Sequence, residues 1–272
     1  MKKKIALLLA VITLVASLFA FAGCSKQPAA DEGKDAAAQT DLDYIKEKGK
    51  LVIGVTDFAP MDYKDENGEW IGFDADMAKA FAKSLGVDAE IVEINWDNKS
   101  LELQNKSIDC VWNGMTIDDE VKAAMNCSKA YCDNAQVVIV NKDVADKYKE
   151  AADCKALKFA VEKGSAGAKE AVANGFDIVE VDTQAKALLE VKSGNCDAAI
   201  IDSLMAGAMI GEGTDYADLV ATVALNSEKY GVGFRKDSNL ADELNKFFDA
   251  SLADGTMEKV AEQYGVQEAL IK

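Results

Sequence analysis

The chain has 272 residues, of which 30 are Lys or Arg and 47 are Asp or Glu, so its formal charge is −17. It contains no histidine and a single arginine, Arg235, which excludes Ser-His-Asp and Cys-His triads and imidazole metal ligands. The acidic charge repels phosphate backbones and argues against a nucleic acid partner. The hydrophobic fraction of 49% indicates a globular protein rather than a disordered one.

The N-terminal residues have the pattern of a secretory signal. Three lysines follow the first methionine, and an uncharged, apolar-rich run occupies residues 5–22, as in a signal peptide. The ending Phe21-Ala22-Gly23-Cys24 resembles the bacterial lipobox, in which the cysteine receives a lipid and becomes the mature N-terminus. We therefore expect a lipoprotein signal peptide over residues 1–23, lipidation of Cys24 and a flexible tether over residues 24–40. A retained transmembrane anchor is the alternative.

The remaining cysteines indicate neither zinc nor a disulfide framework. They are odd in number and lack CxxC spacing, and they are Cys110, Cys127, Cys132, Cys154 and Cys196. Zinc sites use closer pairs, and export permits disulfides without requiring them. We favour thiols that pack as small hydrophobic side chains.

From residue 51 onward, strand and helix patterns alternate. Strands are predicted over residues 51–55, 89–94, 108–112, 137–140, 157–161, 177–181 and 197–201. Helices are predicted from Asp74, a candidate N-cap, to Gly86, and over residues 98–105, after Gly164, and over 185–192 and 203–210. This alternation is typical of α/β folds.

Two stretches of the chain are alike. Residues 91–94 and 178–181 both carry an Ile-Val-Glu strand that leads through a helix to an Asp, 18 residues after the first Ile in one case and 19 in the other. Chance similarity between two βαβ units is possible because Ile-Val-Glu is a common strand composition. The pattern favours two similar α/β lobes.

Short motifs over roughly four fifths of the chain occur in a characteristic order. They are Gly49–Gly54, Phe58–Met61, Gly72–Asp76, Asn113–Ile117, Ser128–Tyr131, Asp197–Asp202, Tyr230–Lys236 and Asp254–Thr256. With these motifs the chain resembles family 3 of the extracellular solute-binding proteins, the binding components of ABC importers for polar amino acids. Each motif alone is weak, whereas their order and spacing are specific.

The resemblance implies a periplasmic-binding-protein-like type II fold, in which two α/β lobes joined by two crossing strands close on a ligand. Residues 41–137 and 233–272 would form lobe 1, and residues 138–232 would form lobe 2. The implied function is capture of an amino acid or a related amine-bearing solute and its delivery to a membrane permease. We expect a monomer without enzymatic activity, cofactor or metal, held by its lipid on the outer face of the cytoplasmic membrane.

The resemblance also implies ligand contacts in the first lobe. Phe58 and Trp96 follow the first two long strands, where the family places rings against the side chain of the ligand. Ordinary core or rim aromatics are the alternative. Asn113, Gly114 and Thr116 follow the end of a predicted strand, where α/β sheets bind ligands, although a simple turn would have the same composition.

In the second lobe, Ser165 and Ala166 lie in a glycine-rich turn before a predicted helix. Free N–H groups and the helix dipole suit a ligand carboxylate there, although such a turn is commonly only an N-cap. Asp202 directly follows an apolar strand, and the family uses the matching Asp to hold the α-ammonium group. A capping role for Asp202 is an alternative that does not exclude the first.

The chain departs from the family at one binding position. Where most members carry a Glu-Arg pair whose guanidinium grips the carboxylate, this sequence reads Glu120-Val121. A ligand carboxylate must then rest on Thr116, on N–H groups near Ser165 and on Lys122, or the ligand lacks a free carboxylate.

Glu162 is a second departure, because relatives often carry Lys or Gln there. With Asp57 and Asp202 it would suit a cationic side chain, or it would point to solvent. The alternatives for function are a binding protein for a polyamine, a betaine-like solute or a short peptide, a sensory or adhesive binding lobe, and a dehydratase-like enzyme on the same fold.

Overall fold

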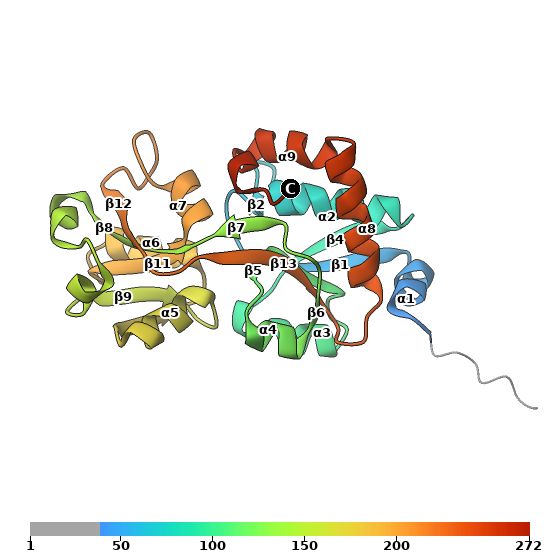
Figure 1. Cartoon of the computed structure of the whole chain (residues 1–272), viewed down its shortest axis with the longest axis horizontal. Helices are drawn as coiled ribbons and strands as arrows, with labels where there is room; N and C mark the ends of the chain where they lie inside the picture. The colour runs from blue at the N-terminus through green and yellow to red at the C-terminus, as the bar shows by residue number, and fades with distance from the viewer. Residues whose placement is uncertain (1–38) are drawn as a thin grey trace, which may run out of the picture. The chain divides into compact units, whose positions relative to one another are not determined.

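The structure is a computed structural model that describes residues 39–272 (Figure 1). The predicted signal peptide, Cys24 and most of the tether lie outside the described residues. Residues Gln39–Lys272 form one compact unit. Within that unit, no helix combines the length and the apolar character needed to cross a membrane.

The first sheet has the strand order β4-β1-β5-β13-β6, with β7 also pairing with β13. These strands are β1 (Lys50–Val55), β4 (Asp88–Glu93), β5 (Cys110–Thr116), β6 (Asn126–Cys127), β7 (Cys132–Asn134) and β13 (Glu228–Phe234). Six helices accompany this sheet: α1 (Asp41–Lys48), α2 (Phe73–Ser84), α3 (Lys99–Gln104), α4 (Asp119–Ala124), α8 (Leu240–Ala253) and α9 (Thr256–Tyr264). Helices α2, α8 and α9 cover one face, and α3 and α4 lie on the other (Figure 1). We call this sheet with its helices lobe 1; a hairpin of β2 (Tyr63–Lys64) and β3 (Trp70–Ile71) and the 3₁₀ turns η1 (Trp96–Asn98) and η4 (Gln267–Ala269) complete it.

The second sheet has the order β10-β9-β11-β8-β12, and with its helices we call it lobe 2. Its strands are β8 (Gln136–Asn141), β9 (Lys158–Glu162), β10 (Asp177–Val181), β11 (Ala198–Asp202) and β12 (Leu219–Ala224). The helices are α5 (Ala166–Asn174), α6 (Gln184–Lys192) and α7 (Ser203–Met209), with 3₁₀ turns η2 (Lys142–Lys147) and η3 (Ala151–Cys154).

The chain crosses between the two sheets twice, from β7 to β8 and from β12 to β13 (Figure 1). In each lobe three parallel strands are followed in the sheet by an antiparallel strand, β13 in lobe 1 and β8 in lobe 2. The repeat seen in the sequence therefore corresponds to equivalent units, β4-α3-β5 and β10-α6-β11. This is the predicted α/β architecture of two lobes joined by two crossing strands.

Strand pairing shifts the expected lobe limits by a few residues. Gln136 and Val137 already pair with β11 of the second sheet. Residues 228–230 pair with β7 of the first sheet, and all of β13 belongs to that sheet. The expected limit at residue 233 thus falls inside β13, because one continuous strand carries the chain from the crossing into the sheet.

Two local predictions in lobe 1 are wrong. Helix α2 begins at Phe73 with Gly72 at the N-cap and no side-chain cap. Asp74 lies in the first turn, where its carboxylate accepts hydrogen bonds from the Gly114 N–H at 2.6 Å and the Tyr131 hydroxyl at 2.7 Å. Strand β5 extends to Thr116, so Asn113 and Gly114 lie inside a strand rather than after one. The added hydrogen bonds with β13 explain the extension.

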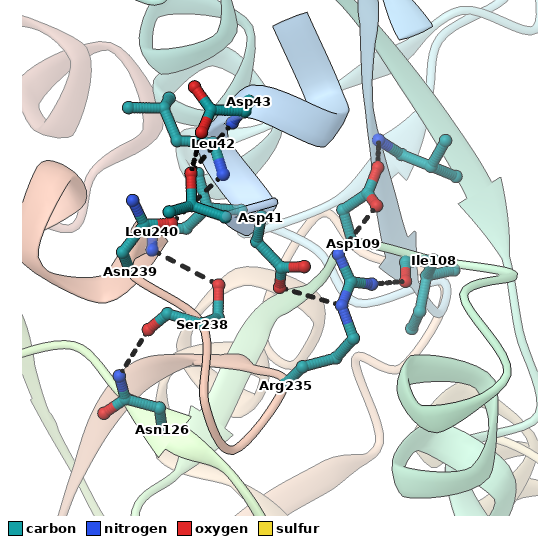
Figure 2. Close-up of polar contacts among 12 residues, drawn as sticks. Asp41, Leu42, Asp43, Ile108, Asp109, Asn126, Arg235, Ser238, Asn239 and Leu240 are labelled. Carbon is teal, nitrogen blue, oxygen red and sulfur yellow. Dashed lines mark hydrogen bonds and ion pairs between the residues drawn. The ribbon is translucent and has the colours of Figure 1, made fainter. Parts of the chain in front are cut away.

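The only arginine stabilises lobe 1 and lies outside the space between the lobes. Arg235 donates to the carboxylates of Asp41 at 2.8 Å and Asp109 at 3.2 Å and to the carbonyl of Ile108 at 2.9 Å (Figure 2). Asp109 is fully buried and also accepts from Lys48 at 2.6 Å. This cluster anchors α1 to the sheet.

The equivalent residue of lobe 2 has no such cation. Asp197 accepts from the Lys158 N–H at 2.9 Å, just as Asp109 accepts from the Val52 N–H at 2.8 Å. Asp197 is exposed to solvent, so water compensates its charge. The two lobes therefore share a backbone motif but differ in the electrostatics around it.

The five cysteines of the described part are free thiols, and four of them are buried. Burial raises the pKa of the Cys110 and Cys132 thiols, so both stay protonated near neutral pH. The predicted packing of the cysteines as small hydrophobic side chains agrees with the burial of four of them.

Candidate functional site

A cavity of about 30 Å³ lies between the lobes, at the carboxyl ends of β1, β5, β9 and β11. Its lining contains all nine residues predicted to bind ligand: Phe58, Trp96, Asn113, Gly114, Thr116, Glu162, Ser165, Ala166 and Asp202. The volume holds about two water molecules, so a larger molecule enters only when the lobes move apart. We call this cavity and its lining the cleft.

Asp202 is the most strongly hydrogen-bonded carboxylate of the cleft. Its side chain accepts from the Tyr230 hydroxyl at 2.6 Å, from Gln136 at 2.9 Å, and from the side-chain amides of Asn134 and Gln184. It is only 4% exposed, and burial, with a further contribution from Glu228, raises its pKa to about 7. It occupies the N-cap position of α7 but makes no capping hydrogen bond, and its side chain lines the cleft instead.

Glu162 lies at the end of β9, next to β11 in the sheet. It is only 3% exposed, so it does not point to solvent. Burial and the nearby charge of Asp202 raise its pKa to about 8. Its Oε1 has no hydrogen-bond partner, which leaves one buried acceptor facing the cleft.

The two predicted aromatic residues are both buried. Phe58 meets the ring of Tyr230 edge to face at 6.3 Å between centroids. A Cβ at Gly114 would lie 2.3 Å from Phe58, so glycine is required for the ring to pack against the backbone there. Trp96 carries the ammonium group of Lys99 over its face, 4.7 Å from the ring centroid.

The polar side chains of β5 are largely engaged within the protein. The amide of Asn113 bonds to Thr56 and Asp62 at 2.8–3.1 Å, so its side chain ties β1 to β5. The Thr116 hydroxyl donates to Glu228 at 2.7 Å. These residues therefore shape the cleft and offer a ligand mainly their backbone.

Ser165 and Ala166 begin helix α5. The Ser165 hydroxyl accepts from the Ala168 N–H at 3.1 Å, as an N-cap does. The first N–H groups of a helix have no partner within it, so that of Ala166, which lines the cleft, is a donor there. The capping role and the anion-binding role of this turn are therefore compatible.

Five polar lining residues escaped the sequence analysis: Thr56, Lys99, Asp118, Lys169 and Gln184. Lys99 donates to the carbonyls of Trp96 at 3.2 Å and Gly164 at 3.1 Å, and burial lowers its pKa. Lys169 forms ion pairs of 2.7 Å with Asp118 and with Glu120 across the lobes. Gln184 accepts from the backbone N–H of Asp202 at 2.8 Å. No motif marks these positions, because both lysines reach the cleft from helices with exposed polar faces.

Other expected participants lie elsewhere. Asp57 lines a separate hollow with Asp182 and Tyr216, and Lys122 lines a neighbouring groove rather than the cleft. Val121 does line the cleft. Among residues 39–272, no group of three or more Cys, Asp or Glu side chains is placed to hold a metal ion.

The matches to known proteins point to one family. Residues 51–267 match the family described as bacterial extracellular solute-binding proteins, family 3. The L-cystine-binding protein TcyJ of Escherichia coli K12 is 29% identical over 247 residues, which cover 89% of this chain and 90% of that protein.

Two solved structures are also similar. The arginine-bound form of truncated ArgBP from T. maritima has a TM-score of 0.72 and 37% identity, covering 76% of this chain and 99% of that one. The ancestral amino acid-binding protein AncCDT-1, described as a precursor of cyclohexadienyl dehydratase, has a TM-score of 0.75 and 35% identity, covering 82% and 98%. These neighbours confirm the predicted type II fold.

Proposed function

The chain belongs to family 3 of the bacterial extracellular solute-binding proteins, and we propose that it captures an amino acid in the cleft between its lobes for an ABC importer. The observation that carries the proposal is the convergence of nine residues from both lobes on one cleft around the buried Asp202. Members of such a family differ in ligand, so the amino acid class is argued from the cleft itself.

Asp202 is proposed to hold the α-ammonium group of the ligand. A buried carboxylate surrounded only by neutral donors gains from a cation at hydrogen-bond distance. Its position on β11 of lobe 2, in contact with Tyr230 of lobe 1, means that the ammonium group would bind where the lobes meet. Ligand binding would thus favour the closed arrangement.

The carboxylate of the ligand is proposed to lie at the N-terminus of α5. The N–H group of Ala166, which lines the cleft, and the positive end of the α5 dipole would both favour an anion there. Lys99 and Lys169, which also line the cleft, would supply positive charge near it. Phe58 and Trp96 are proposed to flank the ligand side chain.

We propose further that the protein is a lipoprotein. Residues 1–23 would be its signal peptide and Cys24 its lipidation site. The lipid would hold it on the outer face of the cytoplasmic membrane, near its permease. The variant Cys24→Ala tests this: the protein should move from the membrane fraction to the soluble fraction, and an unchanged distribution would contradict lipid anchoring.

Calorimetric titration of the purified protein with the common amino acids tests the ligand proposal. At least one should bind with a 1:1 stoichiometry, and mass spectrometry of ligand released by unfolding should identify it independently. Putrescine, glycine betaine and short peptides belong in the same titration. Binding of one of these and of no amino acid would replace the proposal with its alternative.

An enzymatic role is the weaker alternative. AncCDT-1 is itself named an amino acid-binding protein, and the curated relative TcyJ is a binding protein. We therefore propose that the chain is not an enzyme. Conversion of a carboxylated ring substrate by the purified protein, without a stable complex with any amino acid, would reverse this ranking.

A further inference from the structure

The charged groups of the cleft do not balance. Five charged side chains line it: Lys99, Asp118, Glu162, Lys169 and Asp202. Lys169 pairs with Asp118 at 2.7 Å, so these two compensate each other. Lys99 remains against the two carboxyl groups of Glu162 and Asp202, and an excess of one acidic group results.

An amino acid with an uncharged side chain would leave this excess in place. Its ammonium and carboxylate groups add equal and opposite charges, so they cannot neutralise both Glu162 and Asp202 while also meeting Lys99. A buried carboxylate without a partner is costly, so one of the two acids would keep its proton while such a ligand is bound. Both acids can be ionised together only with a ligand whose net charge is +1.

Glu162 is placed to meet such a charge. It is nine-tenths or more buried and lines the cleft, and its Oε1 has no hydrogen-bond partner. The Lys99 ammonium group does not fill this role, since it donates to the carbonyls of Trp96 and Gly164. Asp202, in contrast, already accepts from four side chains.

We infer that Glu162 is a specificity-determining residue that selects amino acids with a second cationic nitrogen, which would bind at Glu162 while the α-ammonium group binds at Asp202. The ligand class is then a basic amino acid. This inference rests on the proposed function, and it also gives the burial of Glu162 a role, since burial keeps the carboxyl group protonated until a cation displaces the proton.

Titration calorimetry with matched ligand pairs tests the inference on the full mature chain. The pairs are ornithine and norleucine, 2,4-diaminobutyrate and norvaline, and arginine and citrulline, in which a cationic group is exchanged for a neutral group of similar shape. The cationic member of at least one pair should bind about tenfold tighter or more than its neutral partner.

Three variants separate charge from structure. Glu162→Gln should remove the preference for the cationic member while leaving binding of the neutral member within about threefold. Glu162→Asp keeps the charge and should retain the preference. Glu180→Gln makes the same change at an exposed position of β10 in the same lobe and should leave all affinities unchanged, so it controls for net charge.

The outcomes are distinguishable. Tighter binding of the neutral members, or equal weakening of both members in Glu162→Gln, would overturn the role of Glu162 while leaving the proposed function intact. Binding of no amino acid at all would overturn both. A preference that survives Glu162→Gln would assign the selection to another residue and would also contradict the inference.

Discussion

Replacing Asp202 with asparagine should weaken ligand binding and should also make the protein alone harder to unfold at neutral and alkaline pH. The two effects have one cause: the carboxylate is buried among neutral donors, which stabilise its charge less well than water does. A ligand ammonium group would supply the stabilisation of the negative charge that the carboxylate loses when it is buried away from water. The variant therefore separates the binding function of Asp202 from its effect on stability.

The pKa of Asp202 sets the size of the effect on the free energy of unfolding. It rises from 3.8 to about 7 on folding, and each pH unit of difference is worth about 1.4 kcal/mol, so the ionised carboxylate opposes folding by about 4 kcal/mol. Because the folded-state pKa lies above the unfolded value, this cost is absent below about pH 4, grows as the pH rises, and is complete above about pH 7. Asparagine cannot ionise and escapes the cost, although its amide nitrogen meets the donor of Gln184 and offsets part of the gain.

Urea denaturation of the ligand-free variant and wild type at a series of pH values between 4.5 and 8 measures this effect. The difference in unfolding free energy should move in favour of Asp202→Asn by about 3 kcal/mol over that range, while ligand affinity falls about 30-fold or more. Asp133→Asn removes the same charge from an exposed site and should show neither change. A stability difference that does not vary with pH would refute the assignment of the raised pKa to Asp202.

Three further predictions follow from the same contacts. Val121→Arg places a guanidinium at the cleft and should tighten binding of amino acids with a free carboxylate about tenfold, as seen by calorimetry, whereas loss of all binding would contradict this expectation. Binding of a cationic ligand should release about one proton at pH 7.5, because the pKa values of Glu162 and Asp202 are raised to about 8 and about 7 and the ligand lowers both. Calorimetric titrations in buffers of different ionisation enthalpy measure the number of protons released. Proton uptake on binding would contradict the reasoning. Asp109→Asn should lower the free energy of unfolding, measured by urea denaturation, by about 3–5 kcal/mol, because Lys48 and Arg235 lose their buried partner. The exposed Asp197→Asn should lower it by less than about 1 kcal/mol. Equal losses would contradict the electrostatic difference between the lobes.

The alternation of apolar strands and amphipathic helices made the α/β class and its two lobes predictable from the sequence. Strand ends were less predictable, because hydrogen bonding to a distant partner decides them. β5 continues to Thr116 only because β13, more than a hundred residues later, pairs with it. The role of Asp74 was missed for the same reason: its partner Gly114 is a neighbour in space and not in sequence.

The residues of the candidate site also include some that could be predicted from the sequence and some that could not. Residues at strand ends, such as Glu162 and Asp202, were predictable because the carboxyl ends of strands meet at the cleft. Lys99 and Lys169 were not, since a lysine on a short helix looks like any solvated lysine. Only the fold brings Lys169 opposite Asp118.

The magnitudes of these contacts decide what stabilises the closed lobes. Lys169 with Asp118 and Lys163 with Asp97 join the lobes through ion pairs whose side chains are about one third to one half exposed, and exposed pairs of this kind contribute about 0–1 kcal/mol each. A ligand cation at the buried Asp202, as proposed, would contribute several times more, because there the alternative is a buried carboxylate without a charged partner. The surface pairs therefore set the relative orientation of the lobes, and the ligand supplies most of the free energy of closure. Salt should consequently weaken ligand binding only slightly, since the pairing that matters is removed from solvent.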